Sequence, residues 1–152
     1  MRFNGQRLVT PLYQHLLHAS RPTLGFVGIP LNVPCPIPYF ECQAAYVAEA
    51  WARGPGSAEE LTSEAEREAW VERRLAAVRA IGREQDFHNT KADGGSAWAY
   101  MRELLRAVHA KCPPAPEGDS WVQRPTWEAR LATMEEVHLA VKKDWYLFLV
   151  IT

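Results

Sequence analysis

Apolar residues form one short continuous run near the start of the chain and regularly spaced stripes further along it. The run covers residues 23–29, TLGFVGI, and lies between Pro22 and Pro30. Because consecutive positions are apolar, without alternation, the run predicts a strand of a parallel sheet that is buried on both faces. A weaker strand is predicted near residues 7–9, and residues 12–18 predict either one helical turn or a loop.

Helical spacing dominates the rest of the sequence. A first helix is predicted to open at Pro38 and to stop at Gly54, because proline is favoured in a first helical turn and glycine at a helix end. Ser57 followed by Glu60 is a capping-box pattern, which predicts a second, charged helix that continues to about Ile81. Glutamates and arginines are expected to cover this helix outside one apolar face, which is formed by Val71, Leu75 and Val78.

Two more helices are predicted in the second half of the chain. Ser96 is a suitable cap for a helix whose apolar residues step by three and four positions: Trp98, Met101, Leu105, Val108 and Cys112. A last helix is predicted over residues 126–143. The closing stretch WYLFLVIT, residues 145–152, is too short to span a bilayer and is typical of an edge strand or a docked tail.

These elements predict an α/β fragment that is mostly α as it stands. A strand buried on both faces needs neighbouring strands on either side, and the sequence does not obviously contain them. We therefore expect one or two strands that belong to a larger sheet, followed by three or four helices.

Composition and charge narrow the possible functions of this chain of 152 residues. Its hydrophobic fraction of 47% is ordinary for a globular protein, and its formal net charge of -1 argues against a nucleic-acid partner. No membrane span or signal-peptide core is predicted. Three cysteines without CxxC spacing favour a reducing, cytoplasmic setting over a disulfide framework or a zinc site. His15 and His18 form an HxxH pair, but no third ligand lies near them in the sequence.

The passage GIPLNVPCPIPYFECQ, residues 28–43, combines a strand end, four prolines and a helix start. Glycine at the strand end permits close approach of a ligand, and the prolines keep the connection extended. The start of a helix carries partial positive charge and favours an anion. One interpretation is therefore a rigid loop that directs a helix N-terminus into a binding cleft; the other is a proline-rich turn between two core elements.

Three phrases occur here in order: PLY-x-H at residues 11–15, FVGIP at 26–30 and FECQ at 40–43. Together with Pro22, Leu24 and Ala48, they resemble the C-terminal part of flavin-containing monooxygenases, especially the plant and microbial S-oxygenating branch. The resemblance is specific over residues 5–54. It continues more weakly through five further positions: His88, Tyr100, Leu104, Pro113 and Pro114.

The resemblance implies a fold and an activity for the full-length protein. FAD, reduced by NADPH, forms a hydroperoxide that oxygenates soft nucleophilic sulfur or nitrogen in small molecules, while the protein binds, orients and excludes water. The family's two glycine-rich dinucleotide fingerprints belong upstream of the matched region, and this chain has no GxGxxG after a strand. We therefore expect residues 1–54 to end an FAD-binding domain, residues 55–152 to form its helical extension, and the chain to be inactive alone.

The resemblance also implies which residues would contact the cofactor. The strand end and loop would run along the flavin, and the following helix would direct its positive end toward the pyrimidine edge of the ring. The residues so implied are Gly28, Ile29, Pro30, Leu31, Phe40 and Gln43. No catalytic residue and no metal ligand are expected in this chain.

Two other classes of function remain open. A non-enzymatic helical interaction module would bind a partner through its apolar stripes at Trp98 and Trp127. A cysteine-dependent enzyme would need a reactive thiolate, for which Cys35 and Cys42 are the candidates, Cys42 near a predicted helix start that could lower its pKa.

Overall fold

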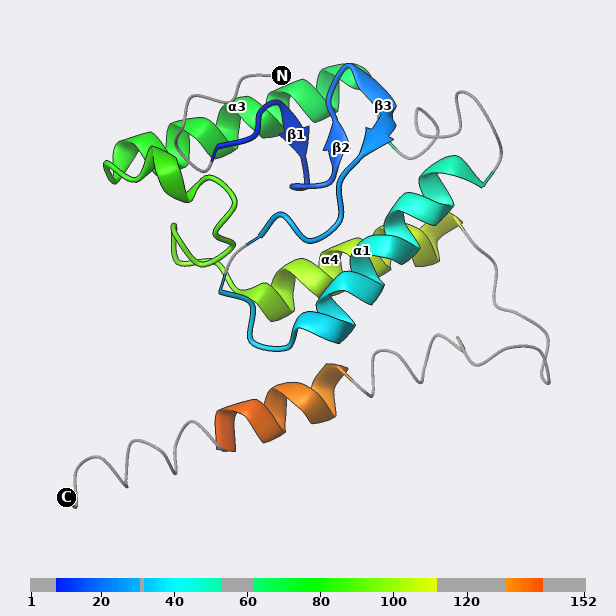
Figure 1. Cartoon of the computed structure of the whole chain (residues 1–152), viewed down its shortest axis with the longest axis vertical. Coiled ribbons are helices and arrows are strands. Elements are labelled where there is room, and N and C mark those ends of the chain that lie inside the picture. The colour runs from blue at the N-terminus through cyan, green and yellow to red at the C-terminus, as the bar shows by residue number, and fades with distance from the viewer. Residues whose placement is uncertain (1–7, 31, 53–61, 112–130, 141–152) are drawn as a thin grey trace. The chain divides into compact units, whose positions relative to one another are not determined.

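The computed structural model describes residues 8–30, 32–52, 62–111 and 131–140. The chain divides into two compact units, Met1–Lys111 and Cys112–Thr152. The first unit contains a small sheet followed by helices, and the second contains a helix over residues 131–140 (Figure 1). The expected class, a mostly helical α/β fragment, is confirmed.

Three short antiparallel strands form the sheet, in the order β1-β2-β3. They are β1 (Leu12–Tyr13), β2 (Leu17–His18) and β3 (Arg21–Gly25). Leu12 lies opposite His18, and Leu17 lies opposite Gly25. The stretch 12–18, predicted as a helical turn or a loop, is thus a hairpin, and no strand forms at residues 8–9.

The prediction of a parallel strand buried on both faces at residues 23–29 is wrong. The strand begins earlier, at Arg21, ends at Gly25, and pairs antiparallel with β2. β3 is the last strand of the described sheet, so one of its edges has no neighbouring strand there. Leu24, in β3, exposes 42% of its surface, and Val27, two residues after the strand, exposes 49%.

Helix α1 spans Pro36–Trp51, with Cys35 at the N-cap. It begins two residues before the predicted start at Pro38, because Pro36 already occupies the first helical turn. Its buried side includes Tyr39, Gln43 and Tyr46. At its other end, the Trp51 indole N–H donates to the Pro22 carbonyl at 2.8 Å and so joins α1 to β3.

Helix α3 spans Glu64–Ala80 and opens with a capping box between Ser63 and Glu66. The capping box predicted at Ser57 lies outside the described residues. The predicted end at Ile81 is confirmed, as is the burial of Val71 and Val78.

The expectation that arginines would only cover the solvent side of α3 is wrong. Arg67 is fully buried and Arg74 is 9% exposed, in the same stripe as Val71 and Val78. Arg67 donates from Nε to the Ala19 carbonyl at 2.6 Å and also to the Thr62 carbonyl. The two guanidinium groups are stabilised inside the unit because backbone carbonyls accept their hydrogen bonds.

Helix α4 spans Ala97–Lys111 and begins directly after Ser96, the predicted cap. The Ser96 hydroxyl accepts from the Trp98 N–H at 3.2 Å, and the Ser96 carbonyl accepts from the Tyr100 N–H at 3.0 Å. The predicted apolar stripe is buried at Trp98, Met101 and Leu105. A short 3-10 helix, η1 (Glu84–Asp86), lies in the connection from α3 to α4.

The helices of the first unit pack in two groups. α1 packs against α4, while α3 packs against β1 (Figure 1). A core cluster joins α3 to the hairpin and the loop before α4, and its buried members are Ala19, Val71, Val78, Phe87 and Ala92. The connection between β2 and β3, which contains Ala19, therefore packs against α3 and the loop that precedes α4.

In the second unit, residues 131–140 are helical, which agrees with the central part of the helix predicted over 126–143. The tail at 145–152 lies outside the described residues. Within the described part of the chain, no helix combines the length and apolarity needed to cross a membrane.

Candidate functional site

The turn between β1 and β2 has an unusual backbone. Gln14 and His15, its two central residues, have φ values of 50° and 59°, and the Leu16 N–H donates to the Tyr13 carbonyl at 2.9 Å. Such turns normally use glycine or asparagine, because other side chains are strained at positive φ. Two strained residues cost on the order of 1 kcal/mol each, so contacts of their side chains must hold them in place.

His15 meets His88 inside the unit. The two Nδ1 atoms are 3.2 Å apart, and His15 is 2% exposed. Burial, followed by the nearby His88 and Arg74, lowers the pKa of His15 well below its usual value. Burial also lowers the pKa of His88, to about 4, against a backbone hydrogen bond at Val9. Both imidazoles are therefore neutral at pH 7, and the ring N–H of one donates a hydrogen bond to the ring nitrogen of the other.

The direction of that hydrogen bond depends on Val9. The His88 Nε2 lies 2.9 Å from the Val9 carbonyl oxygen and 3.2 Å from the Val9 nitrogen. When Nε2 of His88 carries a proton and donates to the carbonyl, His15 donates from Nδ1 to His88, and Nε2 of His15 is an acceptor. In the other tautomer, Nε2 of His15 is a donor. Depending on the tautomer, Nε2 of His15 is therefore either a hydrogen-bond acceptor or a hydrogen-bond donor.

A chain of hydrogen bonds links the hairpin to α4, α1 and the loop after β3. The Tyr100 hydroxyl donates to the Gln14 carbonyl at 2.7 Å and accepts from Gln43 Nε2 at 3.0 Å. Gln43 in turn accepts from the Gly28 N–H at 2.9 Å through Oε1. The Gln14 side chain adds a bond from Nε2 to Glu103 Oε1 at 2.7 Å. These contacts fix Gly28 relative to two helices.

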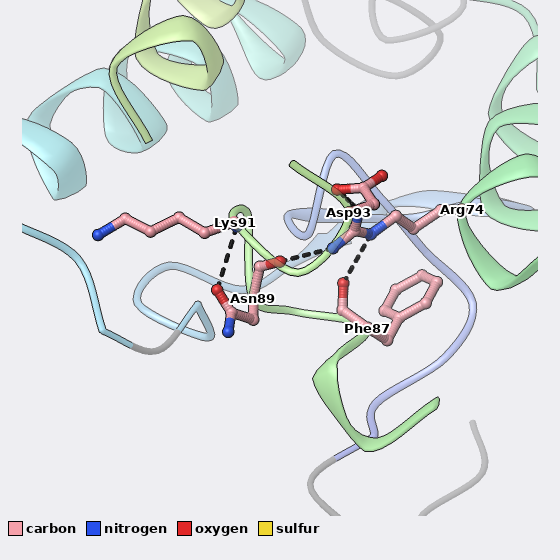
Figure 2. A network of polar contacts seen from close by, with 5 residues as sticks. All are labelled: Arg74, Phe87, Asn89, Lys91 and Asp93. Atoms are coloured by element: carbon pink, nitrogen blue, oxygen red, sulfur yellow. Dashed lines mark hydrogen bonds and ion pairs between the residues drawn. The ribbon is translucent and has the colours of Figure 1, made fainter. Parts of the chain in front are cut away.

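Arg74 holds the loop that follows η1 (Figure 2). Its Nε donates to the Phe87 carbonyl at 3.0 Å and its Nη2 to the Asn89 carbonyl at 2.6 Å, while Nη1 pairs with Asp93 at 2.7 Å. Partial burial tends to raise the pKa of Asp93, but the hydrogen bond and charge of Arg74 lower it overall. Within the loop, the Lys91 N–H donates to Asn89 Oδ1 at 3.1 Å. One arginine thus shapes the segment from Phe87 to Asp93.

A cavity of about 180 Å³ lies where these elements meet. The turn contributes Gln14 and His15, and α3 contributes Trp70 and Arg74. The remaining wall comes from the loop and the first two turns of α4: Thr90, Gly95, Ser96, Ala99, Tyr100 and Glu103. The cavity therefore collects strained, buried and polar residues that are far apart in the sequence.

The implied cofactor residues lie elsewhere, after β3 and at the start of α1. Gly28 is exposed at φ 87°, and a Cβ there would lie 3.6 Å from the Phe40 ring. Ile29 is half-buried and Pro30 is buried, while Leu31 lies outside the described residues. Gln43 is fully buried with both ends of its amide engaged, so it would reach a cofactor only through Gly28.

The start of α1 offers fewer hydrogen-bond donors than expected of a helix N-terminus. Pro36 and Pro38 lack an N–H, and the Tyr39 N–H donates to the Cys35 carbonyl at 3.2 Å. No side chain caps this end. Only the N–H of Ile37 remains in the first turn, so an anion there would be attracted mainly by the helix dipole. Glu41 is exposed and lies beyond this turn.

The buried thiol of Cys42 is not a reactive one. Burial, with a smaller contribution from Glu41, raises the pKa of Cys42 to about 12, so this thiol stays protonated at neutral pH. The possibility that the helix start lowers its pKa is therefore wrong. Cys35 is half-buried at the N-cap of α1. Among the described residues, no group of three or more histidine, cysteine or acidic residues could hold a metal ion.

Sequence reasoning missed seven residues of the cavity wall: Gln14, Trp70, Arg74, Thr90, Gly95, Ala99 and Glu103. The positions of Arg67 and Arg74, four before and three after Val71, carried a signal, because they continue the buried stripe of α3. No protein-family model, no curated protein and no solved structure matches this chain. Any functional proposal therefore rests on the residues described above.

Proposed function

We propose that this chain is the C-terminal portion of an FAD- and NADPH-dependent monooxygenase that oxygenates soft nucleophilic sulfur or nitrogen in small molecules. The chain is inactive alone in this proposal, because the dinucleotide-binding fingerprints belong to the preceding part of such a protein. It would act in the cytoplasm.

The observation that carries the proposal is the convergence of the matched phrases. Gly28 belongs to FVGIP, Gln43 to FECQ and Tyr100 to the weaker downstream match, and one hydrogen-bond chain joins all three. His15, from PLY-x-H, lies against His88 of the same downstream match. Residues matched by order and spacing alone thus share one network with residues matched specifically.

Two further features support a cofactor role for the loop after β3. Gly28 presents exposed backbone at a positive φ and has no side chain of its own, which lets a flat ring approach this backbone beside the Phe40 ring. Within the described residues, one edge of β3 has no neighbouring strand and Leu24 is exposed, which suits a strand contributed by a preceding domain.

The alternatives fit the structure less well. The interaction module would need Trp98 at the surface, but Trp98 is only 6% exposed, and Trp127 lies outside the described residues. The cysteine-dependent enzyme would need a thiolate, whereas burial keeps Cys42 protonated.

Fragment complementation tests the proposal. The chain is co-expressed with the dinucleotide-binding part of a flavin-containing monooxygenase that ends before the PLY-x-H phrase. We expect the two parts to co-purify, retain FAD and oxidise NADPH, which neither does alone.

Two glycine variants make the test specific to the loop. Gly28→Trp should abolish FAD retention, because the new ring would fill the space assigned to the flavin. Gly82→Trp is the matched control, since Gly82 also has a positive φ, 68°, but has nothing within 4 Å of its Cβ position. Failure of every pair to retain FAD, or equal flavin content in the two variants, would overturn the proposal.

A further inference from the structure

The cavity beside α4 is separate from the loop assigned to the flavin. Neither Gly28 nor Phe40 contributes to its wall, whereas His15, Trp70, Tyr100 and Glu103 do. Its volume of about 180 Å³ leaves room for on the order of six water-sized groups. A small molecule could thus enter without displacing any residue of the cofactor loop.

Two charged side chains, Arg74 and Glu103, line the cavity, and together with Asp93, the ion-pair partner of Arg74, they carry a net charge of -1. The guanidinium of Arg74 is compensated by Asp93, whose carboxylate lies 2.7 Å from Nη1. Glu103 is exposed, and its carboxylate accepts a hydrogen bond from the neutral amide of Gln14. His15 and His88 add no positive charge at pH 7. These groups together favour a cation over an anion.

The two ends of the cavity differ in polarity. Arg74 and the start of α4 at Ser96 form one end, where the helix dipole opposes a cation. Glu103 lies seven residues further along α4, about 10 Å away along the helix axis. A positive group is therefore favoured at the Glu103 end.

Aromatic rings form the walls between these ends. The His15 ring lies edge-to-face with Trp70, with centroids 5.2 Å apart, and 5.7 Å from Tyr100. A cation held against the face of tryptophan or tyrosine gains electrostatic stabilisation from the ring. Among the described residues, the hydrogen bonds of the His15 ring use Nδ1, which leaves Nε2 available as an acceptor when His88 donates to Val9.

We propose that this cavity binds a small primary ammonium ion. The ammonium group would donate to the Glu103 carboxylate and to Nε2 of His15, and its short alkyl chain would lie against Trp70 and Tyr100. In this arrangement, the strained turn positions two groups of the site. His15 supplies the acceptor imidazole, and Gln14 supplies the amide that donates to Glu103. The site is independent of the cofactor role proposed above and needs no flavin.

Titration of the full chain with propylammonium chloride at pH 7.5 and constant ionic strength tests this site. NMR of ¹⁵N-labelled protein follows the imidazole nitrogens of His15 and the indole N–H of Trp70. We expect saturable shifts at both residues with propylammonium and none with propionate, which has a similar size and the opposite charge. The Nε2 resonance of His15 should move toward that of a hydrogen-bonded acceptor.

Variants of two exposed glutamates locate the cation. Glu103→Gln keeps an acceptor oxygen for Gln14 but removes the charge, and should weaken propylammonium binding about threefold, as expected for a partly solvated ion pair. Glu72→Gln, on the exposed side of α3, is the control and should bind as the unaltered chain does. The proposal is overturned if propionate binds as tightly, if Glu103→Gln has no effect, or if propylammonium causes no saturable shift.

Discussion

Tyr39 and Tyr100 stack their rings with centroids 5.1 Å apart and planes 24° apart, but their hydroxyl groups differ. The Tyr100 hydroxyl bonds to Gln14 and Gln43, whereas the Tyr39 hydroxyl is buried without a hydrogen-bond partner among the described residues. The Tyr100 hydroxyl thus connects α4 to the β1–β2 turn and to α1, whereas the Tyr39 hydroxyl makes no such connection.

This difference predicts different outcomes for two conservative substitutions. Tyr100→Phe should lower the free energy of unfolding by about 2 kcal/mol, because it leaves the Gln14 carbonyl and the Gln43 amide unsatisfied. Tyr39→Phe removes a hydroxyl without a well-formed hydrogen bond and should change stability much less. Urea denaturation measures both. Hydrogen exchange at the Gly28 amide should accelerate in Tyr100→Phe alone, and equal exchange in the two variants would contradict the hydrogen-bond chain described here.

Acid should destabilise the fold through the buried histidine pair. The pKa of His88 is lowered from 6.5 to about 4 in the folded chain, so the unfolded chain binds a proton that the folded chain refuses. Stability is therefore complete above pH 6.5, falls as the pH drops from 6.5 toward 4, and loses about 3 kcal/mol from this group over that range. Urea denaturation at several pH values, followed by tryptophan fluorescence, measures the loss.

A variant separates this effect from the titration of carboxylates. His88→Gln keeps a polar side chain but cannot be protonated, so the free energy of unfolding should depend less steeply on pH between 6.5 and 4. His15 acts in the same direction, since burial also lowers its pKa, and some slope should remain. An unchanged slope in His88→Gln would show that other groups dominate acid unfolding.

Arg67 should be more important for stability than its charge suggests. Arg67→Met preserves most of the aliphatic volume but leaves the carbonyls of Ala19 and Thr62 without their buried donor, at a cost of about 2–4 kcal/mol. Arg73→Met, on the exposed side of the same helix, should change stability by less than about 0.5 kcal/mol. Thermal denaturation compares the two, and similar midpoints would contradict the structural role of Arg67.

Gly95 should not tolerate a side chain. A Cβ at this position would lie 2.3 Å from the Thr90 carbonyl oxygen, so the backbone of the loop must move. Gly95→Ala should cost about 2 kcal/mol or more. Gly82→Ala, where the Cβ would meet nothing within 4 Å, should cost only the strain of its positive φ, about 1 kcal/mol. Circular dichroism in urea checks the order of the two variants.

The helices were more predictable from sequence than the sheet. The apolar steps in α4 and the cap at Ser96 fixed that helix almost to its first residue, because both signals are local. The sheet depends on pairing, which periodicity does not reveal. The apolar run at 23–29 gave no indication that β3 lies at a sheet edge, and a turn centred on Gln14 and His15 lacks the glycine or asparagine that identifies a hairpin.

The candidate site was predictable only in part. The phrases that contain Gly28 and Gln43 directed attention to the loop after β3, but nothing in the sequence pairs Gln43 with Tyr100, 57 residues later. Likewise, a charged residue is expected to face solvent, so the burial of Arg74 becomes intelligible only through the carbonyls of Phe87 and Asn89 and the carboxylate of Asp93. Both cases depend on tertiary contacts without a local signal.

The turn at Gln14 and His15 has a consequence for the order of folding. An isolated hairpin with two residues at unfavourable φ values would rarely be populated, since nothing local repays the strain. The strands on either side should therefore pair late, once α4 supplies the Tyr100 hydroxyl and the loop supplies His88. During synthesis, the hairpin segment leaves the ribosome before Tyr100 and His88 have been made. We therefore expect this segment to gain its structure only after those later residues are available.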